Sequence, residues 1–286
     1  MKLFAATLLA CGVLVTSSVP RHNRFFRDDN EVKDFTGHKM LRIFPSDLHH
    51  VKHLHSLEHE FEMDFWNNPM NDLRPVLTVV DPQREHLFIK SLNSSSIKYE
   101  ILHHNFQSVV DRERSEMIQP RNFQAIDDSF NYFVYHTYDE IKNQIQFLAE
   151  KCKQFIKYFF KNLYFLYRYF TIIFSDSSVA KYERVGVTYE NREIPAIVVG
   201  KGSKVIFFEC GIHSREWVTI AFGTWVTNEL LSNPTLAIFL DQYTFVIIPV
   251  LNVDGFVYTH TSNRLWRKTR SKQSGTSCIG ADPNRK

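Results

Sequence analysis

The sequence predicts an α/β protein: a sandwich built on a mostly parallel or mixed sheet, preceded by a smaller α+β unit. Two observations support this fold class. In the second half of the chain, short apolar runs alternate with helix-length segments, as at 205–209 and 244–250. In the first half, three strand-like runs alternate with two helix-like segments. A length of 286 residues allows about two domains.

The N-terminus has the order of a secretory signal peptide, which we place at residues 1–18. Lys2 precedes an apolar run over 3–15, and small residues follow at 16–18. Because the run is too short to cross a bilayer as a helix, we expect a secreted, extracellular protein with no membrane partner. A net charge of only +3 gives no reason to expect a nucleic-acid partner.

The segment from about 34 to 110 is predicted to form the small α+β unit. Its expected elements are a strand at 39–45, a helix at 46–63, a strand at 76–80, a helix that begins near 87–92 and a strand at 97–102. This order makes two βαβ-like halves. The unit contains no constellation of metal ligands or nucleophiles, so we expect it to bind or regulate rather than to catalyse.

Residues 111–129 are polar and predict an exposed linker that proteases can reach. The linker contains Arg112, Arg114 and Arg121. A second domain is expected to begin near Tyr132. Its predicted elements are a helix at 139–150, a hairpin of strands at 182–187 and 194–199, a strand at 205–209, a helix through 231 and a buried strand at 244–250.

The segment from His213 to Glu216 is the strongest candidate for chemistry. It follows an apolar strand and a Gly211-Ile212 turn, which predicts that His213 and Glu216 lie three residues apart on the first turn of a helix. A neutral imidazole nitrogen and a carboxylate oxygen are both zinc ligands, and a catalytic zinc takes three protein ligands and one water. Two such ligands are visible here.

The same spacing occurs twice more, at His55/Glu58 and His59/Glu62. Chance matches are expected in a chain with thirteen histidines. Both pairs lie in a charged, helix-like segment with no strand or turn nearby, so they are interpreted as residues of a solvated helix.

Three later segments add polar residues in a fixed order: 252–256, 263–271 and 282–285. On composition alone, 264–270 is a basic surface loop and Asp282 is a helix cap or turn residue. Together with the segments around them, however, they resemble the zinc metallocarboxypeptidases of the carboxypeptidase A/B type. The resemblance also rests on Leu41-Arg42-Ile43, Asp64-Phe65-Trp66, Phe130-Asn131-Tyr132, the run 135–141 and the run 211–217.

The resemblance implies a role for each matching residue. His213 and Glu216 match two zinc ligands, and Asp282 matches the carboxylate that orients the zinc-bound histidine. Arg267 matches the side chain that stabilises the oxyanion of the tetrahedral intermediate. Three further residues match substrate-binding positions: Asn284 and Arg285, which hold the terminal carboxylate of the peptide, and Arg215 farther out.

The resemblance also implies a domain plan. Residues 1–18 are the signal peptide, 19–121 are a ferredoxin-like, inhibitory activation propeptide with its linker, and 122–286 are part of an α/β/α carboxypeptidase domain with a mixed sheet. A trypsin-like protease is expected to activate the precursor after Arg121, with Arg112 and Arg114 as alternatives.

Two departures from the family pattern stand out. The family's third zinc ligand, general base and specificity residue match no position up to Lys286, so the chain as written is expected to be inactive. Residues 152–175 form an aromatic insert with no counterpart in the family, which is either a retained intron or a lineage-specific insertion.

The predicted function is that of a secreted precursor that hydrolyses C-terminal residues from peptides. The alternative is a non-catalytic secreted protein that kept the propeptide fold as an inhibitor or binding module.

Overall fold

A computed structural model describes residues 32–118, 130–162 and 179–285, with side chains described up to 151 in the second range. The predicted signal peptide, the predicted cleavage residue Arg121 and residues 163–175 of the insert lie outside the described residues. Residues 32–286 cluster into one compact unit by their contacts. In the described part of the chain, no helix is both long and apolar enough to cross a membrane.

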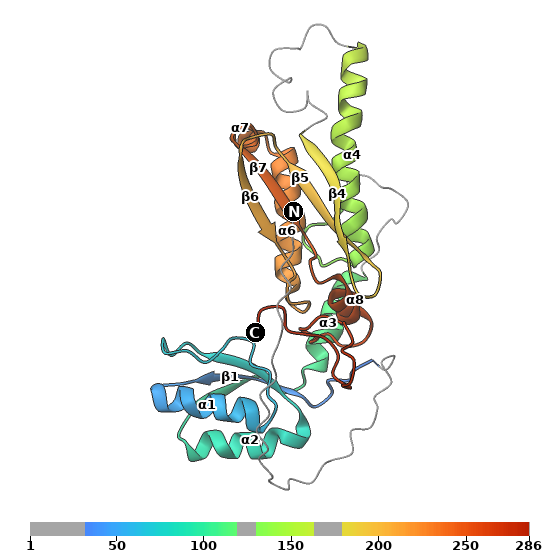
Figure 1. The fold of residues 1–286 in the computed structure, drawn as a ribbon. Coiled ribbons are helices and arrows are strands. Elements are labelled where there is room, and N and C mark those ends of the chain that lie inside the picture. Colours follow the sequence, from blue (N-terminus) through green and yellow to red (C-terminus); the bar gives the residue numbers. More distant parts are fainter. Residues whose placement is uncertain (1–31, 119–129, 163–178, 286) are drawn as a thin grey trace. The chain divides into compact units, whose positions relative to one another are not determined.

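The first half of this unit contains a three-stranded antiparallel sheet. Its strands are β1 (Lys39–Phe44), β2 (Val76–Val80) and β3 (Lys98–His103), in the order β2-β1-β3. Helices α1 (Leu48–Glu60) and α2 (Pro82–Ser94) lie side by side along this sheet (Figure 1). Asp47 and Asp81 cap these helices, because each carboxylate accepts backbone N–H groups of the first turn.

The core of this half lies between the sheet and its two helices. Leu41 and Ile43 of β1 and alternate residues of β2 are buried on the face that the helices cover. The helices contribute residues at three- and four-residue spacing, which places them on one stripe. The buried residues that meet there include Leu41, Ile43, Leu54, Leu57, Val76, Val80, Phe88 and Leu92. The predicted strands and helices of this α+β unit are thus confirmed. Most of their observed ends lie within a few residues of the predicted ends.

Helix α3 (Gln107–Met117) occupies the first part of the segment that we expected to be an irregular linker. Val110 is buried and packs with Phe35, Met40 and Phe106 on the other face of the sheet. The sequence signal was weak because the helix buries a single side chain among its own residues. The polar composition of 111–117 therefore belongs to a one-sided helix rather than to an exposed coil.

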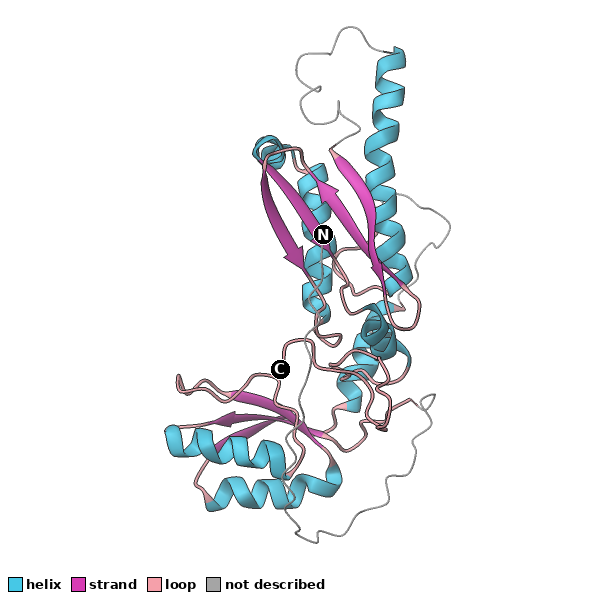
Figure 2. Ribbon diagram, in the orientation of Figure 1, coloured by secondary structure: helices cyan, strands magenta, loops and turns pink. Residues whose placement is uncertain are grey.

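The second half contains a four-stranded mixed sheet in its described residues, as predicted. The strands are β4 (Ala180–Val187), β5 (Glu193–Val199), β6 (Lys204–Glu209) and β7 (Tyr243–Ile248), in the order β4-β5-β7-β6. The hairpin β4–β5 and the pair β5–β7 are antiparallel, whereas β6 and β7 are parallel. Figure 2 shows this sheet with helices beside it.

Helices α4 (Tyr138–Asn162) and α6 (Trp217–Ser232) pack on the same face of that sheet. Their side chains Leu148, Ala149, Leu230 and Leu231 meet Ile197 and Ile247 of the strands in a buried cluster. The backbone of α4 continues twelve residues beyond the predicted end at 150, into the insert. A short 3-10 turn (Pro234–Leu236), α7 (Ala237–Gln242) and α8 (Val253–Thr261) complete the described order.

Candidate active site

The turn between β6 and α6 carries the predicted metal ligands. Gly211 begins it with φ +67°, where a Cβ would meet Ile220 at 2.8 Å. The N–H of Glu216 donates to the carbonyl of His213 (3.1 Å), and α6 begins at Trp217 with Glu216 as its N-cap. The prediction that both residues lie within the first turn of the helix was therefore wrong. They lie in the loop that leads into the helix, which begins at Trp217. Glu216 approaches the helix N-terminus, where its negative charge is favoured.

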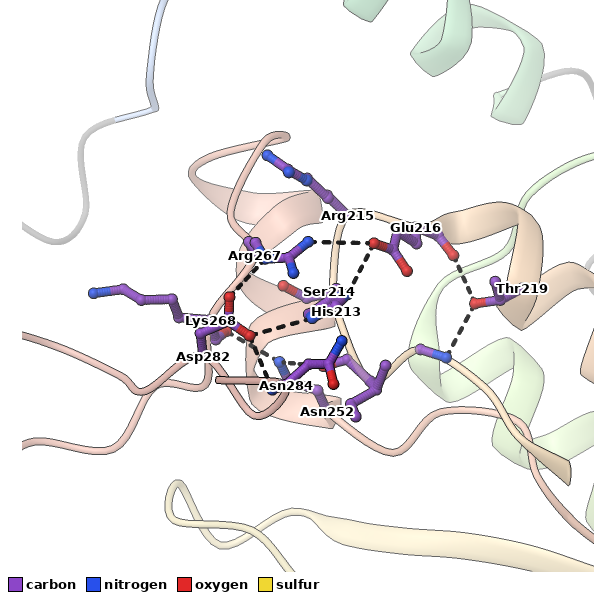
Figure 3. A network of polar contacts seen from close by, with 12 residues as sticks. His213, Ser214, Arg215, Glu216, Thr219, Asn252, Arg267, Lys268, Asp282 and Asn284 are labelled. Carbon is purple, nitrogen blue, oxygen red and sulfur yellow. Dashed lines mark hydrogen bonds and ion pairs between the residues drawn. The ribbon is translucent and has the colours of Figure 1, made fainter. Parts of the chain in front are cut away.

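His213 and Glu216 point toward one another (Figure 3). Nδ1 of His213 lies 2.9 Å from Oε1 of Glu216, and Nε2 lies 3.2 Å from Oδ1 of Asp282. The separation of Nδ1 and Oε1 is a few tenths of an ångström shorter than the roughly 3.3 Å between two ligands of a tetrahedral zinc. A small outward movement of the carboxylate would suit the ion. The carboxylate on Nε2 fixes the ring orientation that a zinc-binding histidine needs.

Asp282 joins the predicted ligand His213 to Arg267. Its Oδ2 accepts a hydrogen bond from Nε of Arg267 (2.8 Å), while Oδ1 faces His213. Burial raises the pKa of the Asp282 carboxyl, but the Arg267 hydrogen bond, the backbone N–H of Asn284 and the charge of Arg267 outweigh it and hold the pKa at about 2. Asp282 is therefore ionised over the whole physiological pH range. Arg267 also places Nη1 3.5 Å from Glu216.

The three predicted substrate-binding residues lie at two places. Arg215 is buried and forms a two-pronged ion pair with Asp64 of the first half, with Nη2 3.0 Å from Oδ1. Asn284 and Arg285 are exposed, and Arg285 donates to the side chain of Asn68 (3.1 Å). Both arginines thus contact the segment just after α1.

The segment 264–270 is not a basic surface loop, which corrects the interpretation from composition alone. The side chain of Arg264 is 13% exposed, and it lies 3.7 Å above the ring of Trp217 while forming a two-pronged ion pair with Glu113 of α3. The Arg270 guanidinium lies 3.7 Å from the Tyr258 ring and 4.8 Å from the Trp266 ring. These cations are packed against aromatic rings, which desolvates them and fixes their positions.

The other two His-x-x-Glu pairs behave as predicted for a solvated helix. His55 and Glu58 have side chains that are 47% and 32% exposed, with Nδ1 and Oε2 3.5 Å apart. His59 and Glu62 are both exposed, and Glu62 lies beyond the end of α1. Within the described ranges, no group of three or more His, Cys, Asp or Glu residues is arranged to hold a metal ion. The predicted ligands His213 and Glu216 therefore have no third such residue arranged with them in the described part of the chain.

Sequence reasoning missed several residues that shape this site. Ser214 and Asn252 donate hydrogen bonds to backbone carbonyls of the segment 264–270, which we call the Arg267 loop. Glu113 of α3 forms an ion pair with Arg264, 151 positions away in sequence. Partial signals were present: Ser214 stands between the two ligands, and Asn252 follows a buried strand. The ion pairs of Asp64 and Glu113 have no local signal, because only the tertiary structure brings their partners together.

Comparison with known proteins finds carboxypeptidases. A family model described as zinc carboxypeptidase matches residues 171–286, and one described as carboxypeptidase activation peptide matches residues 41–113. Carboxypeptidase A1 of Mus musculus is 34% identical over 263 residues, and carboxypeptidase A2 of the same organism is 32% identical over 260. Each alignment covers 88% of this chain but only 57% and 56% of the relative.

Solved structures give the same fold. The crystal structure of carboxypeptidase A from Helicoverpa armigera aligns with a TM-score of 0.70 at 23% identity, covering 88% of this chain and 57% of that one. Thrombin activatable fibrinolysis inhibitor aligns with a TM-score of 0.64 at 23% identity, covering 87% and 58%. The chain spans somewhat more than half the length of these proteins. The chain thus matches a carboxypeptidase activation-peptide domain followed by part of a zinc carboxypeptidase domain.

Proposed function

We propose that this chain is the N-terminal part of a secreted zinc carboxypeptidase precursor, which removes C-terminal residues from peptides once its propeptide is cut away. One observation carries the proposal: His213 and Glu216 face one another, and Asp282 bonds both His213 and Arg267. This arrangement brings two zinc-type ligands, the residue that orients one of them and a fixed cation into one site. Bound zinc lowers the pKa of its water and polarises the scissile carbonyl.

The residues of this chain have distinct roles in the proposed reaction. Asp282 holds Nε2 of His213, so that Nδ1 stays directed at the metal position. The guanidinium of Arg267, held by Asp282, stabilises the negative charge that develops on the scissile carbonyl oxygen. Asn284 and Arg285 hold the terminal carboxylate of the peptide, for which arginine offers two parallel N–H donors. Arg215 contacts the peptide farther from the scissile bond.

The propeptide is proposed to inhibit by occupying these substrate-binding groups. Asp64 supplies a carboxylate to Arg215, and Asn68 supplies an amide oxygen to Arg285. Each contact engages an arginine that would otherwise bind substrate. A cavity of about 400 Å³ remains beside them, lined by both halves, with Asp64, Trp66, Arg267 and Asp282 among its residues. A cut at Arg121 in the segment between the halves fits this arrangement, and we propose domain boundaries at 18 and 121.

The alternative, a non-catalytic binding or inhibitory protein, has one observation in its favour. Among the described residues no group of three His, Cys, Asp or Glu side chains is arranged for a metal, whereas a catalytic zinc takes three protein ligands. The two functions differ in what a longer product of the same gene does.

The experiment that separates them begins with the full transcript. Its longest product is expressed with the signal peptide, collected from the medium, treated with trypsin and assayed on blocked dipeptides with basic, aromatic and aliphatic termini. The proposed function predicts secretion, together with hydrolysis that a chelator and Glu216→Ala both abolish. A transcript that encodes nothing beyond the present chain, together with no hydrolysis, would favour the binding protein. Termini that support turnover will also identify the specificity.

A further inference from the structure

Ser214, which stands between the two predicted zinc ligands, has a fully buried side chain. Its hydroxyl donates to the carbonyl of Trp266 (2.6 Å), and its backbone N–H donates to the carbonyl of Arg267 (3.3 Å). We call residues 211–216 the ligand turn. Ser214 of this turn therefore bonds two successive carbonyls of the Arg267 loop.

Asn252 bonds the next carbonyl of the same loop. Its side-chain amide donates to the carbonyl of Lys268 (3.0 Å) and also to that of Ile212, the residue before His213 (3.3 Å). The backbone N–H of Asn252 donates to the carbonyl of Gly211 (3.2 Å). Asn252 is thus joined to the ligand turn on one side and to the Arg267 loop on the other (Figure 3).

The contact between Asn252 and the carbonyl of Lys268 fits beside α8 only because residue 255 is a glycine. A Cβ on Gly255 would lie 2.7 Å from the carbonyl oxygen of Lys268 and 2.7 Å from Oδ1 of Asn252. Oδ1 of Asn252 also accepts the N–H of Gly255 (3.1 Å), which caps α8. The hydrogen bonds of Asn252 therefore join the ligand turn, α8 and the loop.

We propose that Ser214 and Asn252 are positioning residues that set the location of Arg267 relative to His213 and Glu216, through the backbone carbonyls of Trp266, Arg267 and Lys268. We call this set of three bonds the carbonyl clamp. Asp282 ties the side chains of His213 and Arg267 together, and the carbonyl clamp does the same for their backbones. The proposal rests on the proposed function, since the location of Arg267 matters to catalysis only if Arg267 stabilises an oxyanion.

Hydrogen exchange of the Arg267 Nε–H tests the clamp in the present chain, without any enzymatic activity. In the wild type, this N–H is held by Asp282 and should exchange slowly in a spectrum of ¹⁵N-arginine-labelled protein. Ser214→Ala removes the hydroxyl bond to Trp266 and should accelerate the exchange about fivefold, the factor that corresponds to the loss of one buried hydrogen bond. Ser214→Thr, which restores a hydroxyl, should return the rate toward the wild-type value.

Two further variants keep the test decisive. Asn252→Asp retains the oxygen that caps α8 but lacks the amide donor, so it should also accelerate the exchange and can replace Ser214→Ala if that variant does not fold. Thr227→Val is the matched control, because Thr227 is equally buried and donates to a carbonyl within α6 at 2.8 Å, away from the site. The control should leave the Arg267 rate unchanged.

Unchanged exchange in both Ser214→Ala and Asn252→Asp would overturn the clamp, as would equal acceleration in Thr227→Val. In an active longer form, the clamp further predicts that Ser214→Ala lowers kcat by a similar factor and leaves KM unchanged. An inactive longer form would instead reject the proposed function, while the exchange rates would still decide whether the clamp positions Arg267.

Discussion

Arg215 and Asp64 form a two-pronged ion pair between residues 151 positions apart in the sequence, and the ring of Trp66 lies 5.7 Å from the same guanidinium. The Arg215 side chain is 6% exposed and that of Asp64 is 53% exposed. The arginine is therefore a buried cation whose carboxylate partner comes from the propeptide. Removing that partner leaves a buried charge without its main compensation, which is costlier than losing a surface ion pair.

The second ion pair between the two halves, Glu113 with Arg264, leads to a prediction about propeptide release. After cleavage in the segment between them, the propeptide should remain bound through its two ion pairs. In the double variant Asp64→Asn, Glu113→Gln it should separate on a sizing column at moderate salt, because both buried arginines have lost their carboxylates. Glu85→Gln is the matched control, since it removes an ion pair within the propeptide. Co-elution of the double variant's two pieces would contradict these anchors.

Activation by a trypsin-like protease should produce a new N-terminus at Asn122. The neighbouring sites Arg112 and Arg114 lie within α3, where the helical backbone resists entry into a protease active site. N-terminal sequencing of the limit product identifies the cut. A start beyond Phe130 would show that the proposed domain boundary is wrong.

His260 should make stability depend on pH between 7 and 5. Burial lowers its pKa, and the charge of Arg264 lowers it further, to about 3 from an ordinary value near 6.5. The unfolded chain then binds the proton that the folded chain does not, so stability is lost as the pH falls below about 6.5. The free energy of unfolding should drop by about 2 kcal/mol from pH 7 to pH 5 on account of this group.

Urea unfolding at pH 7, 6 and 5 measures this loss. His260→Phe keeps a ring against Trp217, which stacks on His260 at 4.1 Å, and should remove most of the slope. His104→Phe, at an exposed position, is the control and should retain it. An equal slope in wild type and His260→Phe would rule out His260 as its source.

Gly255→Ala should destabilise the chain by about 1–3 kcal/mol, the usual cost of forcing extra volume into a packed site. The new methyl group would lie 2.7 Å from two oxygen atoms, those of Lys268 and Asn252. Gly186→Ala is a suitable control, because its Cβ would meet a single side-chain atom of Ile194 at 3.5 Å. Thermal unfolding of both variants gives the comparison. Equal stabilities of the two variants would mean that the Arg267 loop is not packed on α8 as described.

The insert should prove to be an unspliced intron. Cys152-Lys153 can be encoded TGT-AAG, which contains the splice-donor sequence GTAAG. Phe174-Ser175-Asp176 can be encoded TTT-TCA-GAT, which contains the acceptor TTTTCAG. Removing that intron keeps the frame and joins Lys151 to a tyrosine and then Ser177. Genomic DNA without the GT at codon 152 would refute the intron, leaving a lineage-specific insertion.

The sequence was sufficient for elements whose signals are local. The strand at 76–80 is a short apolar run rich in valine, and the Gly211 turn before His213 follows a clear apolar run, so both were placed closely. Helix α3 was missed because it buries only Val110 among its own residues. The predicted ligand pair His213 and Glu216 was identified from its spacing and context and Asp282 through resemblance, and their contacts with one another follow from the tertiary structure.

The sequence could not predict contacts between residues that only the tertiary structure brings together. The basic composition of 264–270 indicated an exposed loop, yet Arg264 and Arg270 are packed on Trp217, Tyr258 and Trp266. Composition counts charges but does not say which aromatic rings lie beside them. The same limit applies to Ser214, whose role depends on carbonyls 52 and 53 residues later in the chain.

Zinc titration of the present chain tests the account most directly. It is best done in a background that carries His55→Ala and His59→Ala, because two histidines four residues apart on an exposed helix can bind zinc themselves. We predict weak binding that His213→Ala and Glu216→Ala each abolish, since the described residues offer this pair and no group of three ligands. Zinc binding that is unchanged by both substitutions would contradict the assignment of His213 and Glu216 as the metal ligands.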